Sequence, residues 1–515
     1  MKAFEKTLYF CIMTTVIFSV CWISTDNIII DVCLINLSYL ILFFADIYLL
    51  CVKKINIFKI VYQAIRENKF FIVLIIYILY EFFNIINGIR NGQVSYLLNK
   101  ILIILKLGFL LLNIVLYIYS NYSDNKSFER KKKNIFLSFG VSTYIIILFT
   151  LIKYFSGNFI LLTRIAPVND YNVFAVTLLF TGSVMVHYII KYLNGKTRLI
   201  LLTITIVLVF SIVYMSGSRR GIIFIYICAI AYILLYLLFY KNKFGRINYS
   251  NIISCVLISV VCFIFCNLAF NGFNYYVEAY ATAAREAVEQ EKTNQDLEMN
   301  NEKQEKEENL IDNKVDSNEI SEPGPQNPTS TEESSEDVSS DKAQKVPGFG
   351  ETRLEDRYET INISEGLSSR SLVWEIAINE IKKMNVLEII FGKGSGYNLS
   401  IYQTEENASL INPDVEPQEI KSDPHNIILN DILEGGIIKI LFMIVIVVMV
   451  ISIALKNIKY NNQESILILC VGMILGGTLM LSARTGLLGV DLFWYLVVLT
   501  FIAQCNIKLE KKDFI

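Results

Sequence analysis

The stretch GGIIKILFMIVIVVMVISIAL at residues 435–455 decides the class of fold. Its only charged side chain is Lys439, and about 20 apolar residues suffice for a helix to cross the hydrocarbon core of a membrane. Eleven other runs along the chain share this character. The twelve runs cover approximately residues 8–23, 28–52, 70–89, 96–120, 135–155, 171–192, 199–215, 221–240, 252–271, 435–455, 464–481 and 487–505. The sequence therefore predicts an all-α, polytopic membrane helix bundle with about twelve transmembrane helices.

The composition agrees with this fold class. Hydrophobic residues make up 54% of the 515 residues, charged residues make up 18%, and the mean hydropathy is +0.48. A surface this apolar excludes a soluble enzyme, a soluble nucleic-acid binder and a disulfide-rich secreted scaffold. All ten cysteines lie in apolar runs, where we interpret them as small hydrophobic residues.

Lysine and arginine set the orientation. With the N-terminus inside, about 23 of these cations fall in cytoplasmic segments and about 6 in the short outer loops, as the positive-inside rule requires. We therefore expect the protein to lie in the cytoplasmic membrane, with both termini in the cytoplasm. The long segment between the ninth and tenth runs is expected outside.

This orientation gives a domain plan. Residues 1–271 carry helices one to nine, residues 272–434 form a large, partly helical extracytoplasmic loop, and residues 435–515 carry helices ten to twelve. Within the loop, residues 286–345 contain 18 acidic side chains, 6 lysines and no aromatic residue. Such a segment cannot bury enough apolar surface to order itself, so we interpret it as a disordered spacer, with an acidic tether for a partner as the alternative. Residues 348–434 are expected to be helical and to bear the functional site.

Two amphipathic helices are expected in that part of the loop. SRSLVWEIAINEIKKM at 369–384 has a helical apolar stripe, with Ser371 as its N-cap, and GKGSG at 392–396 ends the helical region. PHNIILNDILEGGIIK at 424–439 leads directly into the tenth span.

His425 is the candidate base. It lies on the outer side between Pro424 and Asn426, at the start of a membrane helix, and histidine suits proton transfer near neutral pH. The alternative is an ordinary exposed loop histidine. The other histidine, His187, lies near the cytoplasmic end of the sixth run, and we interpret it as a side chain without a catalytic role.

Arginines on the outer side form the second candidate group. Guanidinium groups that converge there would bind a diphosphate bidentately without a metal ion. The alternatives are anchoring to lipid headgroups and pairing with Asp or Glu. The candidates are Arg219 and Arg220 in SGSRRG, Arg164 in RIAPVNDYN, Arg370 before the Trp374 helix, and Arg484 in SARTG.

Ionisable residues also occur inside the spans, where they usually mark function or pair with each other. They are Asp31, Asp46, Glu81, Lys100, Lys106 and Asp491. Lys100 and Lys106 are candidate partners of Glu81. A secondary transporter would use such residues as a relay, and this alternative stays open.

The combination of topology and motifs resembles the O-antigen ligase and polymerase superfamily of envelope polysaccharide enzymes. SGSRRG resembles the family's Ser-Arg-Gly turn, and SSRSLVWEIAINEI followed by IIFGKGSG resembles its Arg, Trp helix and Gly-rich turn. PHNIILNDILEGG resembles the His-Asn helix that enters the tenth span, and VNDYNVFA at 168–175 resembles an Asp-x-Asn turn.

The resemblance implies a metal-independent glycosyltransferase without a cofactor, acting on undecaprenyl-diphosphate-linked saccharides. Arg219 and Arg370 would hold the diphosphate, and His425 would orient or deprotonate the acceptor hydroxyl. Arg164, Arg220, Asn426 and Arg484 are expected to contribute to substrate binding.

The resemblance leaves the kind of transfer open. We expect a polymerase of repeat units for capsule, O-antigen or exopolysaccharide, because the Ile-, Asn- and Lys-rich composition suggests an A+T-rich genome, and many such bacteria have no lipid A core to accept a chain. The alternatives are ligase-type transfer to a lipid, wall or protein acceptor, and a transporter or flippase of envelope intermediates. Expected partners are the lipid-linked donor and acceptor, membrane lipid, and possible flippase and chain-length regulator proteins; no nucleic acid is expected.

Overall fold

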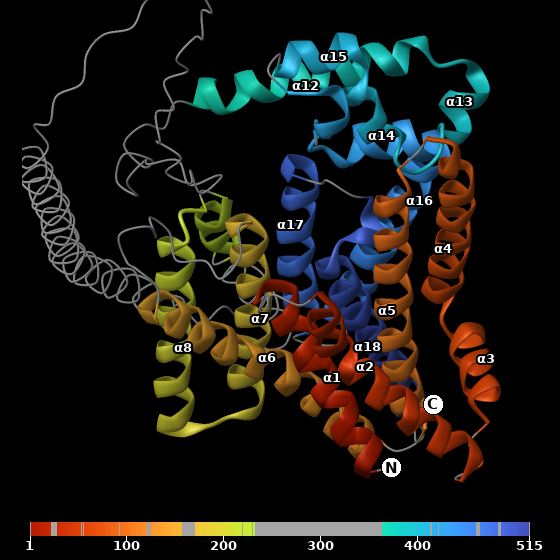
Figure 1. Cartoon of the computed structure of the whole chain (residues 1–515). Coiled ribbons are helices and arrows are strands. Elements are labelled where there is room, and N and C mark those ends of the chain that lie inside the picture. Colours follow the sequence, from red (N-terminus) through yellow and green to blue (C-terminus); the bar gives the residue numbers. More distant parts are fainter. Residues whose placement is uncertain are drawn as a thin grey trace, which may run out of the picture.

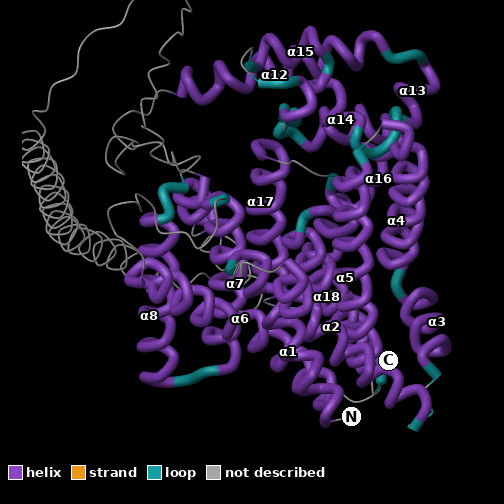
Figure 2. The backbone as a smooth tube through the Cα atoms, in the orientation of Figure 1, coloured by secondary structure: helices purple, strands orange, loops and turns teal. Residues whose placement is uncertain are grey.

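The computed structural model describes residues 2–21, 28–91 without 53 and 55, 93–120, 125–156, 170–231 without 219 and 229, 363–420 without 413 and 414, 422–459, 464–482 and 486–513. In these ranges the chain forms helices and connecting turns and contains no strand, as the tube in Figure 2 shows. The prediction of an all-α membrane protein is confirmed.

The N-terminal part of the chain is a series of long helices with two short ones between them. They are α1 (Lys2–Val20), α2 (Ile28–Cys51), α3 (Ile57–Glu67), α4 (Lys69–Gly88), η1 (Ile89–Asn91), α5 (Val94–Tyr119), α6 (Asn125–Ser156), α7 (Tyr171–Tyr192) and α8 (Gly195–Met215). Residues 220–228 are also helical.

The C-terminal part combines short loop helices with three long ones. They are α12 (Ile363–Lys383), α13 (Val386–Phe391), α14 (Tyr397–Ser400), η3 (Ile401–Gln403), α15 (Glu405–Ile411), η4 (Pro417–Glu419), α16 (Ile427–Lys459), α17 (Glu464–Ser482), η5 (Leu487–Gly489) and α18 (Asp491–Asp513).

Seven helices of the described chain are long and apolar enough to cross a membrane, namely α1, α4, α5, α6, α7, α8 and α16. The helices α2, α17 and α18 contribute shorter apolar stretches. These ten helices coincide with ten of the twelve predicted runs, and the helical residues 220–228 begin the eighth run. The ninth run, residues 252–271, lies outside the described residues, so the count of twelve stays a prediction. The acidic segment 286–345 also lies outside them, and the predicted domain boundaries are not tested.

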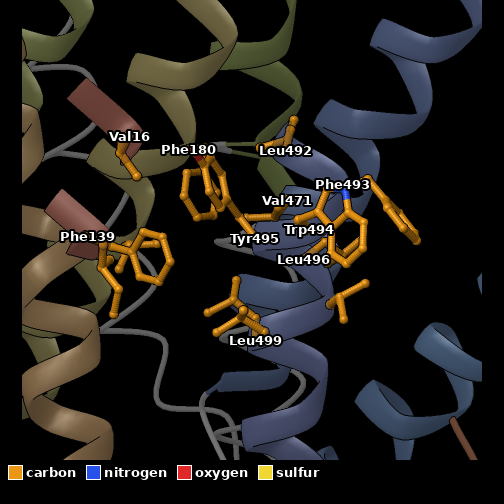
Figure 3. Close-up of a cluster of buried hydrophobic side chains, with 14 of the residues drawn as sticks. Val16, Phe139, Phe180, Val471, Leu492, Phe493, Trp494, Tyr495, Leu496 and Leu499 are labelled. Atoms are coloured by element: carbon orange, nitrogen blue, oxygen red, sulfur yellow. The ribbon is translucent and has the colours of Figure 1, made fainter. Parts of the chain in front are cut away.

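The core of the bundle is built around α18. Figure 3 shows Phe139 of α6, Phe180 of α7 and Tyr495 of α18 meeting in one cluster, with Val16 and Val471 nearby. The Phe180 and Tyr495 rings stack with their centroids 5.0 Å apart, and the Phe139 ring meets Tyr495 edge-on at 5.4 Å. Aromatic packing of this kind fixes the relative positions of α6, α7 and α18.

The loop helices cover one end of the bundle. In Figure 1, α12 and α15 lie across the end at which α17 stops, while the first turn of α1 lies at the opposite end. A separate hydrophobic cluster holds the loop together, including Val373, Ala377, Tyr402 and Leu433. Leu433 belongs to α16, so this small core attaches the loop to a membrane helix.

Three details differ from the sequence-based expectations. First, α12 begins at Ile363, so Ser371 lies inside the helix and is not its N-cap. Second, α16 changes direction at Gly436, which has φ 62° and ψ −164°. The segment that carries the His-Asn motif is therefore a short helix joined to the membrane helix at a break. Third, the amphipathic helix α3 was not predicted, because 11 residues are too few for a membrane span.

Candidate active site

His425 lies in a tightly held turn. It has φ 49°, a left-handed conformation that is uncommon for a residue other than glycine. Its backbone N–H donates a hydrogen bond of 2.7 Å to Oδ1 of Asp423, and its ring Nδ1 lies 3.1 Å from the same oxygen. The Asp423 side chain is buried, whereas 27% of the His425 side chain is exposed. The imidazole of this turn is therefore partly accessible, whereas the carboxylate is buried.

Trp374 of α12 also holds the His425 turn in place. Its indole Nε1 donates a hydrogen bond of 2.7 Å to the carbonyl oxygen of Pro424. The neighbouring Val373 carbonyl accepts a hydrogen bond of 2.9 Å from the buried Tyr402 hydroxyl, which locks α12 onto the loop core. Burial, and then the nearby Asp423 carboxylate, raise the pKa of Tyr402, so this hydroxyl remains a donor. The amphipathic stripe around Trp374 therefore positions the His425 turn.

Arg370 lies one helical turn before Trp374. Residues four apart lie on the same face of a helix, so Arg370 is on the side of α12 that carries Trp374 toward the His425 turn. Its side chain is half-buried. Among the described residues no carboxylate forms an ion pair with it. Arg370 therefore lies one turn from the residue that contacts the His425 turn, and the catalytic roles of Arg370 and His425 stay predictions.

Asn426 has a structural role in addition to its predicted one. Its side-chain Oδ1 accepts hydrogen bonds from the backbone N–H groups of Ile428 at 2.9 Å and Leu429 at 3.3 Å, which caps the start of α16. Its Nδ2 donates to the carbonyl oxygen of Met480, near the end of α17, at 3.3 Å. Substrate binding by Asn426 stays a prediction.

The SGSRRG turn and the Asp-x-Asn turn meet each other. Asp170 caps α7 by accepting hydrogen bonds from the N–H groups of Asn172 and Val173, both at 3.1 Å. Ser218 donates its hydroxyl to Asn172 Oδ1 at 2.9 Å and accepts the Gly221 N–H at 3.1 Å. The SGSRRG and VNDYNVFA motifs thus form one hydrogen-bonded unit.

Both site regions contact α17. A Cβ atom on Gly477 of α17 would overlap the Phe224 ring, so the helix that begins at Arg220 packs tightly there. Met480, one turn further along α17, accepts the hydrogen bond from Asn426. Arg220 lies one helical turn before Phe224 in this segment. The other predicted arginines, Arg164, Arg219 and Arg484, lie outside the described residues.

A buried ionic network lies next to the site, and sequence reasoning found only part of it. Lys100 Nζ lies 2.6 Å from Glu81 and 3.0 Å from Glu434, and Lys439 lies 2.8 Å from Glu434 and 3.0 Å from Asp431. All five side chains are shielded from solvent. The predicted Lys100–Glu81 pair is confirmed. Among the described residues, the ion pairs of Glu81 are with Lys100 and Lys439, and none joins it to Lys106.

The network explains the glycine-rich turn. The Gly394 N–H donates to the Glu434 carbonyl at 2.8 Å, the Gly396 N–H donates to the Glu434 carboxylate at 2.9 Å, and Ser395 accepts from Lys100 at 3.0 Å. The GKGSG turn therefore connects the loop to α16 through hydrogen bonds. The signal that could have revealed it is the pair of charges, Glu434 and Lys439, that flanks two glycines in an otherwise apolar helix.

His187 lies elsewhere. It is buried against the Phe136 ring, with centroids 5.5 Å apart, in the part of α7 near Lys191 and Glu464. Within the described ranges, no group of three His, Cys, Asp or Glu side chains is arranged to hold a metal ion.

These features define a polytopic helical membrane protein with a site built where loop helices meet the membrane helices. Residues 204–444 match the model of a family described as O-antigen ligase, and this range includes the SGSRRG turn, α12 and His425. This part of the chain is therefore similar to the O-antigen ligase family. Members of this family are glycosyltransferase-like enzymes of polysaccharide or glycan assembly. No curated protein and no solved structure matches the chain.

Proposed function

We propose that the protein is a polysaccharide polymerase that joins undecaprenyl-diphosphate-linked repeat units at the outer face of the cytoplasmic membrane. The observation that carries this proposal is the hydrogen bond from Trp374 to the Pro424 carbonyl. It joins the helix that bears a half-buried arginine to the turn that bears the only histidine among residues 348–434. A cation and a base held on one side of a membrane-anchored loop suit glycosyl transfer from a lipid diphosphate.

In this reaction His425 accepts the proton of the acceptor hydroxyl while the hydroxyl oxygen bonds to the anomeric carbon of the donor. The bond from that carbon to the diphosphate oxygen breaks, and undecaprenyl diphosphate leaves with the electron pair. Arg370 and Arg219 hold the diphosphate and offset the negative charge that develops on it. A guanidinium presents two parallel N–H donors to a phosphate group, so these residues can supply that charge without a metal ion or cofactor.

The distribution of lysine and arginine supports an outer location for the site. It puts the first turn of α1 and the end of α18 in the cytoplasm, and Figure 1 has α12 and α15 at the opposite end of the bundle. Arg164, Arg220, Asn426 and Arg484 are proposed to bind the saccharide or diphosphate around this core. A flippase that delivers the donor and a chain-length regulator are the proposed protein partners.

Ligase-type transfer is the second candidate, and the description of the matching family favours it. A polymerase adds repeat units to another lipid-linked chain, whereas a ligase moves a chain to a different lipid, wall or protein acceptor. The test is to give the purified, reconstituted protein a lipid-diphosphate repeat unit as its only saccharide. A polymerase produces a ladder of products, while a ligase produces none until a separate acceptor is added.

The same assay tests the enzyme proposal as a whole. A transporter or flippase would move the lipid-linked unit across the membrane and leave it chemically unchanged. Absence of any new glycosidic bond, with the donor translocated in sealed vesicles, would refute the proposed function in favour of transport. Product formation that EDTA abolishes and a divalent ion restores would refute the metal-independent mechanism.

A further inference from the structure

Asp423 makes two contacts with a single residue, His425. Its Oδ1 accepts the His425 backbone N–H at 2.7 Å and lies 3.1 Å from the His425 ring Nδ1. The two contacts together restrain both the backbone of His425 and the rotation of its side chain. They are made by a carboxylate that is itself buried, while the His425 side chain is partly exposed.

The contact with Nδ1 has a consequence for the tautomer of the ring. In a neutral imidazole one nitrogen carries the proton and the other holds a lone pair, and the hydrogen bond made by one nitrogen decides the assignment. A carboxylate only accepts hydrogen bonds, so Nδ1 next to Asp423 must carry the proton. The lone pair is then on Nε2, the nitrogen on the far side of the ring from Asp423.

The backbone conformation is the second observation. His425 has φ 49°, and non-glycine residues in this region are strained and occur preferentially at functional sites. The Asp423 acceptor and the Trp374–Pro424 hydrogen bond hold the turn in this conformation from both sides. A simple connection between η4 and α16 would not require the buried Asp423 carboxylate to orient the His425 ring.

We propose that Asp423 is a positioning residue that fixes His425 as the Nδ1–H tautomer, with Nε2 directed at the acceptor hydroxyl. This inference rests on the proposed function. Asp423 does not touch the substrate; it orients the base and faces the imidazolium that forms when Nε2 takes up the proton of the acceptor. The arrangement follows the general logic of a base that is oriented by a buried carboxylate.

The chain contains only two histidines, which permits a direct test. The full-length protein is labelled with ¹⁵N-histidine and reconstituted in lipid, and magic-angle-spinning NMR identifies the protonated ring nitrogen of each residue. A His187→Gln variant assigns the signals. We expect the neutral His425 ring to carry its proton on Nδ1. A proton on Nε2 in the wild-type protein would overturn the proposal, and this measurement needs no Asp423 variant to fold.

Variants of Asp423 test the link to turnover. Asp423→Ala should lower turnover by about 10²-fold and convert His425 to the Nε2–H tautomer that predominates in free histidine. Asp423→Asn keeps an acceptor oxygen and should retain the Nδ1–H tautomer, with an intermediate loss of turnover. Glu419→Ala, which removes an exposed carboxylate of η4 from the same loop, is the matched control and should leave both readouts unchanged.

The outcomes separate this inference from the proposed function. Wild-type turnover and an unchanged tautomer in Asp423→Ala would overturn the role of Asp423 alone, because His425 could still act as the base. Normal polymer formation by His425→Ala would overturn the proposed function, and with it any role of Asp423 in the reaction. Loss of turnover in Asp423→Ala together with the change of tautomer would support the proposal.

Discussion

Lys439 Nζ lies 2.8 Å from the Glu434 carboxylate across Gly435 and Gly436, the two glycines at which α16 changes direction. The same ammonium lies 3.0 Å from Asp431, on the segment that begins directly after the His425 turn. A single buried cation thus ties the short site-bearing segment of α16 to its membrane-spanning part. The ion pairs hold the angle of the break, because Asp431 and Glu434 lie before it and Lys439 lies after it.

This relationship predicts a large effect of removing the cation. Lys439→Met should lower the free energy of unfolding by about 3–5 kcal/mol, because it leaves buried carboxylates without their partner. The measurement is thermal or denaturant unfolding in detergent. Lys456→Met, at an exposed position of the same helix, is the control and should have little effect. Equal stability of the two variants would contradict the proposed importance of the network.

The break itself gives the second prediction. Gly436 has φ 62°, and a Cβ atom there would lie 2.6 Å from the Gly392 nitrogen. Gly436→Ala should therefore destabilise the protein by at least about 1–3 kcal/mol and reduce turnover by moving the His425 segment. Gly472→Ala in α17 is the control, since its added Cβ meets no atom within 4 Å. It should be neutral or slightly stabilising, and comparable losses in both variants would show that the break has no special role.

The contrast between these glycines shows what the sequence could predict. The spans follow from local composition, because each apolar run must form a helix to satisfy its own backbone in lipid. Ten of the twelve predicted runs therefore correspond to described helices. The break at Gly436 depends instead on contacts with Gly392 and Ile390, more than 40 residues away in the chain. No periodicity reports such a contact.

Some residues of the candidate site could likewise be predicted from the sequence, whereas others depend on contacts between distant segments. Residue type and chain position suffice to select His425 and Arg370, since a base and a cation on the outer side are unusual in themselves. Asp423 was missed because a carboxylate in a polar loop is ordinary until its burial and its distance from Nδ1 are known. The Lys100–Glu434 pair joins residues 334 positions apart, and only the three-dimensional structure reveals it.

The loop offers a pH-dependent prediction. Glu380 of α12 accepts hydrogen bonds from Tyr397 and from Lys393, the latter at 3.3 Å. Burial alone would raise the pKa of Glu380, but these hydrogen bonds outweigh it and hold the pKa below its ordinary value of 4.5. A carboxyl group whose pKa is lowered on folding stabilises the protein above its unfolded pKa, and this contribution is lost as the pH falls through the native pKa.

The wild-type loop should therefore lose stability as the pH falls below about 4.5, and Glu380→Gln should remove that part of the decline. The measurement is the unfolding temperature of both proteins between neutral and acidic pH. Glu388→Gln, which changes the carboxylate of the capping box of α13, tests whether any nearby acidic group gives the same result. Parallel pH curves for wild type and Glu380→Gln would contradict the prediction.

The arginine prediction separates charge from geometry. Arg370→Lys keeps the positive charge but loses the planar fork that binds a diphosphate bidentately, so turnover should fall severely while the protein still inserts into the membrane. The same result is expected for Arg219→Lys, at the other position proposed to hold the diphosphate. Product formation from a lipid-diphosphate donor is the measurement. Full activity of the Lys variants, with loss only in the Ala variants, would mean that diffuse positive charge is sufficient.

The proposed enzyme depends most on His425. A general base contributes about 10²–10⁴-fold in rate, so His425→Ala should extend chains slower by that factor. The variant should still insert and still bind the lipid-linked donor, because Arg370 and the Trp374–Pro424 contact do not depend on the imidazole. His187→Ala is the control. It removes the other histidine, which packs against Phe136 far from the loop, and should affect stability more than turnover. Near-normal polymer from His425→Ala at matched expression would eliminate the base and leave the arginines as a binding site without the proposed chemistry.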